Sequence, residues 1–332
     1  MRTGRATNLA LAALLVASIF TGFLSFGIGA DWLVHPSVFH GAVALGIVLL
    51  SPWKAMVVRR GLHRPGEGRV ASLAFLGIVL VALGSGLIHS AGLMETIGGL
   101  TIMQVHVGSA LVALALGLAH YRHHPQRMRS TDLDRRGFLR VAAIGLGSFG
   151  LWLGWEGAGR ALGWAGARRR FTGSHEHGSF DPSGFPVTSW INDVPPAIDG
   201  AAWRVVVGEK GYSLDDLVKM VEEDLEATID CTGGWYSTQD WSGVRLDRLV
   251  EPGEWRSIEV ISATGYARRY PVSDLDRLWL AVAVGGDPLS VGHGYPARIV
   301  APDRRGFWWV KWVAAIRPSM SPWWVQSPFP LT

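Results

Sequence analysis

The chain has 332 residues, enough for two domains, and 48% of them are hydrophobic, a high fraction for a soluble protein. It contains one cysteine, which excludes an internal disulfide framework. The net charge is +4, but no block of like charge is long enough to form a nucleic-acid-binding arm, so no nucleic-acid partner is expected.

Four uncharged stretches at the start of the chain are each long enough to cross a bilayer about 30 Å thick, at about 1.5 Å per helical residue. A shorter fifth run, residues 141–155, spans only if the flanks within residues 138–159 contribute. The first stretch could be a signal peptide, but it lacks a clear small-residue cleavage site and three more spans follow. We expect an all-α transmembrane bundle, with a four-helix module in residues 1–125 and the fifth helix in residues 126–160. The four uncharged stretches are residues 6–30, 32–53, 70–94 and 96–121.

The charges of the linkers predict the orientation of these segments. The linkers after the second and fourth stretches are basic, whereas the other two carry Asp31 and Glu95 but no Lys or Arg. Because positive loops stay inside, the N-terminus is predicted to be cytoplasmic. Five crossings then place the C-terminal domain on the outer, periplasmic or extracellular, face of the cytoplasmic membrane. The basic residues are Lys54, Arg59, Arg60, Arg64 and Arg69, and then Arg122, Arg127, Arg129, Arg135 and Arg136.

Histidines in the uncharged stretches are candidate ligands of a haem iron, because lipid-embedded helices rarely carry His without a function. His40 and His106 lie in the first turns of two stretches that run in the same direction, so both are expected near the outer surface, where one b-type haem could bind between them. The alternative is a pair of interhelical hydrogen bonds. His89 is a weaker candidate. His120 lies about 21 Å beyond His106 on one helix face, as in di-haem proteins, but Lys54 occupies the matching position after His40. This part resembles the membrane modules of b-type cytochromes.

Residues 134–140, DRRGFLR, look like a twin-arginine export signal, because two Arg, a spacer, Phe-Leu and a basic residue precede a modest apolar run. The alternative is ordinary inside-positive flanking charge. Since that pathway moves folded proteins, the signal agrees with a domain that receives its cofactor before export. Residues 161–180, rich in Gly, Ser and His, are predicted to be a linker.

Residues 181–332 show short β-like runs and two helical turns, which predict an α+β, mainly β, domain. Ser213 is expected to cap a helix at residues 214–221, and residues 246–249 suggest a further helical turn. The β-like runs are residues 203–207, 226–230, 257–263, 278–284, 297–301 and 308–316.

Residues 229–249, IDCTGGWYSTQDWSGVRLDRL, hold the single cysteine, Cys231. A strand-like run leads to it, and Gly233 and Gly234 allow a tight turn just after it. Trp235 and Trp241 can wall a pocket there. A lone thiol so placed can bind a soft metal as thiolate, and the alternative is a buried structural cysteine.

The stretch around Cys231 resembles the molybdenum-binding segment of the sulfite oxidase family, in which a single Cys thiolate binds the metal of a molybdopterin cofactor. Residues 185–193, FPVTSWIND, resemble the early cofactor segment of that family. Residues 292–302, GHGYPARIVAP, with residues 306–313, GFWWVKWV, resemble its late segment. The sequence TGGW follows the Cys where sulfite oxidases proper have an Asn-Arg-Arg type sequence, so the site looks more like the bacterial membrane-associated branch.

The resemblance implies roles for individual residues. Cys231 would bind molybdenum and carry the catalysis, and His293 would contact the pterin. Arg298 and Lys311 would pair with the pterin phosphate, their alternative being surface salt bridges. The other implied cofactor contacts are Thr188, Ile191, Asn192, Thr264, Trp309 and Val310. An anionic substrate could be attracted by Arg245, Arg268, Arg269, Arg304 and Arg305, whose alternative is simple solvation.

The sequence therefore predicts a membrane-bound molybdopterin-dependent oxidoreductase that exchanges an oxygen atom and two electrons with a small-molecule substrate outside the cytoplasm. Electrons would pass through haem b to or from a quinone or another carrier in the lipid membrane. Two alternatives remain open. One is a molybdoenzyme whose membrane half is only an anchor, and the other is a non-catalytic membrane electron-transfer protein.

Overall fold

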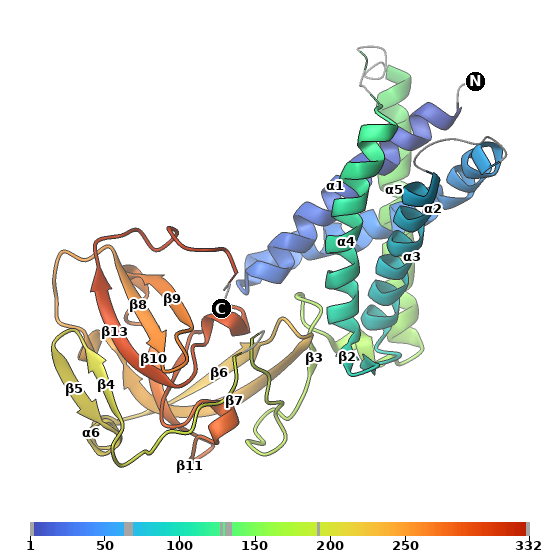
Figure 1. The fold of residues 1–332 in the computed structure, drawn as a ribbon. Helices are drawn as coiled ribbons and strands as arrows, with labels where there is room; N and C mark the ends of the chain where they lie inside the picture. Colours follow the sequence, from blue (N-terminus) through green and yellow to red (C-terminus); the bar gives the residue numbers. More distant parts are fainter. Residues whose placement is uncertain (1–2, 63–68, 127–128, 130–134, 191–192, 330–332) are drawn as a thin grey trace. The chain divides into compact units, whose positions relative to one another are not determined.

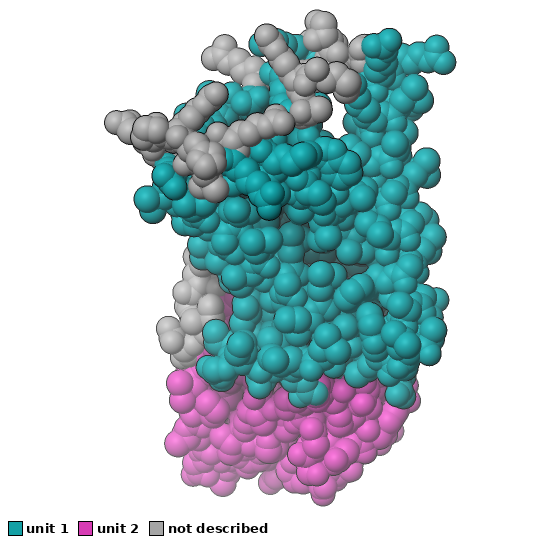
Figure 2. Space-filling view, turned by 90° about the vertical axis from the view of Figure 1, so that its right-hand side faces the viewer, with its two compact units in different colours: residues 1–26, 31–175 teal, residues 27–30, 176–332 magenta. Residues whose placement is uncertain are grey.

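A computed structural model describes residues 3–62, 69–126, 129, 135–190 and 193–329. It divides into two compact units (Figure 2). Unit 1 comprises residues 1–26 and 31–175, and unit 2 comprises residues 27–30 and 176–332. Unit 1 is helical and unit 2 is mainly β, which confirms the predicted fold class (Figure 1).

Among the described residues, unit 1 has five helices that are each long and apolar enough to cross a membrane. Helix α3 packs along α4, and α2 packs along α5. The fifth helix has 27 residues, so the flanks of its apolar run supply the required length. Its first residues are Arg135 and Arg136 of the predicted export signal. The helices are α1 (Thr3–Gly27), α2 (Val34–Leu62), α3 (Arg69–Ala91), α4 (Ile102–His123) and α5 (Arg135–Ala161). The short element η1 (Asp31–Leu33) lies between α1 and α2, and η3 (Ala165–Arg168) follows α5.

The fourth helix begins later than its apolar stretch. Strands β1 (Thr96–Ile97) and β2 (Leu100–Thr101) form a hairpin that turns at Gly98 and Gly99, which both have positive φ. Thr101 then caps α4 in a capping box with Gln104, because each side chain accepts a hydrogen bond from the backbone of the other.

Two sheets build unit 2 (Figure 1). In the first sheet the order is β11-β10-β7-β3, with β12 paired to β10 and β6 paired to β7. Its strands are β3 (His175–Glu176), β6 (Asp224–Asp230), β7 (Trp235–Arg245), β10 (Trp279–Val284), β11 (Asp287–Pro288) and β12 (Arg298–Val300). In the second sheet the order is β5-β4-β13-β8-β9. Its strands are β4 (Arg204–Val207), β5 (Lys210–Ser213), β8 (Ser257–Ser262), β9 (Ala267–Pro271) and β13 (Val313–Ser319).

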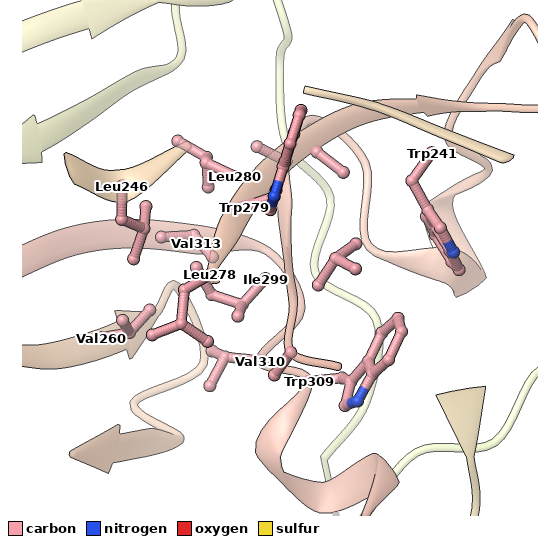
Figure 3. Close-up of a cluster of buried hydrophobic side chains, with 14 of the residues drawn as sticks. Trp241, Leu246, Val260, Leu278, Trp279, Leu280, Ile299, Trp309, Val310 and Val313 are labelled. Atoms are coloured by element: carbon pink, nitrogen blue, oxygen red, sulfur yellow. The ribbon is translucent and has the colours of Figure 1, made fainter. Parts of the chain in front are cut away.

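The core of unit 2 is made by side chains from both sheets (Figure 3). Leu280 and Ile299 come from the first sheet, and Val260 and Val313 come from the second. All four are fully buried. Each such side chain stabilises the fold by about 1.5–3 kcal/mol relative to an exposed position.

Several boundaries differ from the sequence prediction. The eleven-residue strand β7 was missed because buried Ser237 and Gln239 alternate with Trp235 and Trp241 on its inner face, which hides the apolar alternation. The run at residues 308–316 is not one strand. It begins with the turn η6 (Gly306–Trp308), and β13 starts only at Val313.

The predicted helical turns are present. Ser213 caps α6 (Leu214–Met220), which ends one residue earlier than expected, and α7 (Leu246–Leu249) follows β7. The remaining turns are η4 (Val272–Asp274) and η5 (Val291–His293).

Candidate active site

Cys231 lies in the tight turn between β6 and β7. Its N–H donates to the Trp235 carbonyl at 2.8 Å, and its carbonyl accepts from the Gly234 N–H at 3.1 Å. Gly234 has φ +95°, a conformation that favours glycine. The Gly233 N–H donates to Cys231 Sγ at 3.3 Å. The turn therefore fixes the sulfur and directs a backbone donor at it.

The surroundings of Cys231 have opposing effects on the pKa of its thiol. Burial raises the pKa of Cys231, whereas the Gly233 N–H and the Arg305 guanidinium lower it. Metal binding releases the thiol proton and so overcomes the cost of burial. Among the described residues, no three His, Cys, Asp or Glu side chains gather to hold a metal ion.

Two cations, Arg298 and Lys311, face the same site. Arg298 is 1% exposed, and its Nη1 donates to the His293 carbonyl at 3.0 Å. Lys311 Nζ donates to the carbonyls of Thr188 at 2.9 Å and Gly292 at 2.6 Å. Within the described part of the chain, the hydrogen bonds of both cations go to backbone carbonyls and not to carboxylates.

The burial of Arg298 is hard to explain without a ligand. Its guanidinium lies over the rings of Trp241 and Trp309, at 5.1 and 5.6 Å from their centroids, and its Nε is buried with no hydrogen-bond partner. A buried cation is expected to be paired, and a guanidinium matches the oxygens of a phosphate. The donor set thus fits the phosphate of a pterin, and the alternative of a surface salt bridge is wrong for Arg298.

Lys311 is poised to respond to such an anion. Burial and, next, the positive charge of Arg298 lower its pKa to about 7, although the negative charges of Cys231 and Asp193 act in the opposite direction. A bound anion close to Nζ would favour the charged form and restore the ammonium.

Thr188 and His293 frame the site. The Trp235 indole Nε1 donates to Thr188 Oγ1 at 3.0 Å. The His293 ring stacks on Phe185 with centroids 3.8 Å apart, and its two nitrogens lie 2.9 Å from Ser290 Oγ and 3.2 Å from the Phe185 carbonyl. Burial lowers the pKa of His293 to about 4, so the ring is neutral. Both nitrogens already have partners, so the link from His293 to the rest of the site is its carbonyl, which holds Arg298.

The remaining predicted cofactor residues are placed differently. The amides of Trp309 and Val310 donate to the Gly306 and Trp308 carbonyls, so these N–H groups are engaged within the chain. The Trp309 carbonyl instead accepts from Arg298 Nη2 at 3.4 Å. Thr264 is exposed in the turn between β8 and β9, where its hydroxyl lies 3.0 Å from Ser262 Oγ. The predicted residues Ile191 and Asn192 lie outside the described residues.

The five arginines proposed to attract an anion have partners within the chain. Four form ion pairs, and Arg268 Nη1 donates to the Ser327 carbonyl at 3.0 Å. The alternative of simple solvation is wrong for Arg268 and Arg305, which are 2% and 1% exposed. The four pairs are Arg245–Asp247, Arg269–Glu259, Arg304–Asp274 and Arg305–Asp230.

In unit 1, His40 and His106 approach each other with ring centroids 6.0 Å apart and planes at 83°. Each ring is held in the same way by the preceding helix. His40 Nδ1 lies 3.0 Å from the Ser18 carbonyl, and His106 Nδ1 lies 2.8 Å from the Ala82 carbonyl. The interhelical hydrogen bonds of the alternative reading are therefore present, and each uses Nδ1 and leaves Nε2 for a metal.

Two glycines make room for these rings. Gly22 and Gly86 each lie four residues after the carbonyl that holds the histidine, and a Cβ there would lie 3.1 Å from the His40 ring or 3.0 Å from the His106 ring. Glycine at these two positions therefore lets the preceding helix approach the imidazole that it holds.

The weaker histidine candidates have other partners. His89 Nε2 lies 2.7 Å from the Gly173 carbonyl, and its ring faces His175 at 4.7 Å. His120 Nδ1 lies 3.0 Å from Ser72 Oγ, and its ring stacks on Phe75. Of the four predicted histidines, the structure thus brings together His40 and His106.

Comparisons with known proteins bear on unit 2. Residues 191–324 match the family model of the oxidoreductase molybdopterin binding domain. Mitochondrial sulfite oxidase of Rattus norvegicus is 29% identical over 173 residues, which is 40% of this chain and 32% of that protein. The uncharacterized oxidoreductase YuiH of Bacillus subtilis (strain 168) is 28% identical over 151 residues, which is 41% of this chain and 74% of that protein. The solved sulfane dehydrogenase SoxCD of Paracoccus pantotrophus has a TM-score of 0.36 and 23% identity, covering 38% of this chain and 40% of that chain.

The matched segment contains Cys231, Arg298 and Lys311. The family match identifies residues 191–324 as an oxidoreductase molybdopterin-binding domain. More narrowly, this domain is of the sulfite oxidase type. The chain spans about a third of the length of the curated sulfite oxidases that it matches, at 32%.

Proposed function

We propose that the chain is a membrane-bound molybdopterin enzyme that acts on a small molecule outside the cytoplasm. The observation that carries this proposal is the Cys231 turn beside two cations, Arg298 and Lys311, whose hydrogen bonds within the described residues go to backbone carbonyls. Bound molybdopterin supplies a metal that exchanges an oxygen atom and two electrons with the substrate.

Different residues of the chain have different roles at this site. Arg298 and Lys311 neutralise and orient the phosphate of the cofactor. Cys231 binds the metal as a thiolate, held by the Gly233 N–H. Of the five arginines considered for an anionic substrate, four form ion pairs and Arg268 donates to a carbonyl, so we assign none of them to oxyanion selection.

We further propose that His40 and His106 bind one b-type haem, which passes electrons singly to or from a quinone or another carrier in the lipid membrane. The 6.0 Å separation of the rings and the matching Nδ1 hydrogen bonds support this ligand pair. Two rivals remain, an enzyme whose membrane half is only an anchor and a non-catalytic electron-transfer protein.

Analysis of purified full-length protein for molybdenum, pterin and haem tests these alternatives together. All three are expected in the same preparation, with an optical spectrum of b-type haem. Molybdenum and pterin without haem would favour the anchor reading. Absence of molybdenum and pterin from folded protein would contradict the proposal and favour the non-catalytic reading.

The orientation is part of the proposal. The basic linkers and the Arg135-Arg136 pair at the start of α5 support a cytoplasmic N-terminus and an outer unit 2. A reporter fused after Thr332 that works only outside the cytoplasm is therefore expected to be active. Replacing Arg135 and Arg136 with Lys should strand unit 2 inside and abolish reporter activity, whereas the same replacement of Arg122 and Arg129 should not. Activity of a cytoplasm-specific reporter at Thr332 would contradict the topology, and unchanged export of the Arg135/Arg136 variant would remove the twin-arginine signal.

The lowered pKa of Lys311 predicts that cofactor retention depends on pH. With its pKa lowered to about 7 in the cofactor-free protein, Lys311 must take up a proton to bind phosphate at alkaline pH. Affinity should therefore be fully present below about pH 7 and fall above it, by up to about tenfold per pH unit. Pterin retained after incubation at pH 7 and pH 9 measures this slope. Lys311→Arg, which stays charged, should flatten it, and an equal slope in this variant would contradict the assignment.

A further inference from the structure

A buried ion pair lies next to Cys231, the proposed metal ligand. Asp230 is the last residue of β6 and precedes Cys231, and Arg305 comes from the segment before η6. Their side chains are 4% and 1% exposed. Arg305 Nη1 donates to Asp230 Oδ1, while Nη2 donates to the Cys231 carbonyl at 3.1 Å. One guanidinium thus holds the carboxylate of one residue and the backbone of the next.

The backbone around this pair is tied to the same segment. A parallel bridge joins the main chains of Asp230 and Arg305. The following residue, Gly306, lies so close that a Cβ there would be 3.2 Å from the Cα of Cys231. On the other side, the Cys231 N–H donates to the Trp235 carbonyl at 2.8 Å. Cys231 is therefore held from two directions, by β7 and by the Arg305-Gly306 segment.

A buried ion pair at this position has a high cost in desolvation free energy. Two buried charges must be desolvated, and apolar residues of similar volume often stabilise a fold as well or better. A planar guanidinium, however, offers donors in a fixed fork that can serve a carboxylate and a carbonyl at once. A lysine at position 305 would keep the positive charge but would lose this fixed fork of donors.

The next residue along the chain provides a comparison. Arg304 forms an ion pair with Asp274, and the two side chains are 21% and 20% exposed. Arg304 and Arg305 are thus adjacent arginines that each pair with one Asp, and Arg305 in addition donates to the Cys231 carbonyl.

We infer that the Asp230–Arg305 pair is a positioning device that sets the geometry at which the Cys231 sulfur meets the metal. The inference rests on the proposed function of Cys231 as the molybdenum ligand. Arg305 acts through the Cys231 carbonyl and the Asp230 carboxylate, and it touches neither the metal nor the substrate in this role. It is therefore a positioning residue and not a catalytic one.

Arg305→Lys in the full-length, cofactor-loaded protein tests this role, with Arg304→Lys as the matched control. The Arg305 variant should keep molybdenum and pterin but lose about tenfold to a hundredfold in kcat, with KM unchanged, as expected for a slightly misplaced reacting group. Its thiolate-to-molybdenum charge-transfer band should also shift. The Arg304 variant should match the wild type in all of these. A wild-type band and kcat in Arg305→Lys would overturn the inference.

A second variant covers the case in which Arg305→Lys does not fold. Asp230→Asn keeps the shape of the side chain and an acceptor for Arg305 but removes the charge, so a smaller change in the same direction is expected in kcat and in the band. A wild-type band and kcat in a folded Asp230→Asn protein would overturn the inference on their own.

Alkylation of Cys231 by iodoacetamide in full-length protein produced without molybdate separates this inference from the proposed function. If Arg305 restrains the cysteine, Arg305→Lys should react several-fold faster than Arg304→Lys. Equal rates would count against the restraint even if the wild type holds molybdenum. A wild type that never binds molybdenum would instead refute the proposed function, while the alkylation rates would still decide whether the restraint exists.

Discussion

Replacing Cys231 with serine should abolish turnover while unit 2 stays folded. A serine hydroxyl is a harder and far less acidic ligand than a thiol, so the electronics of a bound metal change even if the metal remains. We expect a loss in kcat of about a hundredfold or more, typical of removing a group that touches the reacting centre. Dye-linked turnover, molybdenum and pterin are measured on the same preparation. The pterin should remain, because its phosphate is held by Arg298 and Lys311.

Arg298→Ala is the reciprocal variant of Cys231→Ser. It should release cofactor, weakening its binding by roughly 1.5–3 kcal/mol, the value of a hydrogen bond to a charged group. Protein molecules that still hold cofactor should turn over. The two variants therefore separate a chemical role from a binding role. Wild-type turnover in folded Cys231→Ser would refute the metal-ligand assignment and favour a structural cysteine.

Replacing His106 with alanine should remove the b-type haem spectrum entirely while molybdenum remains. A single imidazole would leave the haem with only one of its two proposed protein ligands, and His40→Ala should act in the same way. His89→Ala is the matched control, because His89 is held by the Gly173 carbonyl and is not paired with another of the predicted ligands. The optical spectrum of the reduced protein and the haem content give the result.

Gly86→Val tests the haem site without changing a ligand. A side chain there meets the His106 ring, so haem content should fall, whereas Gly84→Val adds its side chain to open space and should be tolerated. A full haem signal in both His40→Ala and His106→Ala would contradict the pair, and His89 would become the next candidate.

Much of the candidate site could be predicted from the sequence because the residues of the site are concentrated in short segments. The single cysteine followed by two glycines predicted the turn that the structure shows between β6 and β7. Arg298 and Lys311 lie in the segment that was expected to hold the phosphate, and the structure brings both toward Cys231. Local patterns of this kind survive folding because one turn or one strand positions them.

What the sequence could not show depends on pairs that are distant along the chain. The Arg305–Asp230 pair joins residues 75 positions apart, so nothing local marks Arg305 as buried. Buried polar residues also hid strand β7, because Ser237 and Gln239 lie on its inner face, where both donate to the carbonyl of the distant Gly178. In contrast, helical periodicity and direction were enough to place His40 and His106 at one depth, while the partners of His89 and His120 required the fold.

The central claim is that Cys231 binds molybdenum, and X-ray absorption at the molybdenum edge tests it most directly. Wild-type full-length protein is compared with Cys231→Ser after equal molybdenum loading. Loss of one sulfur neighbour from the metal in the variant is the predicted result, with the remaining sulfur shell unchanged. An identical sulfur shell in the two proteins, both folded and loaded, would contradict the claim.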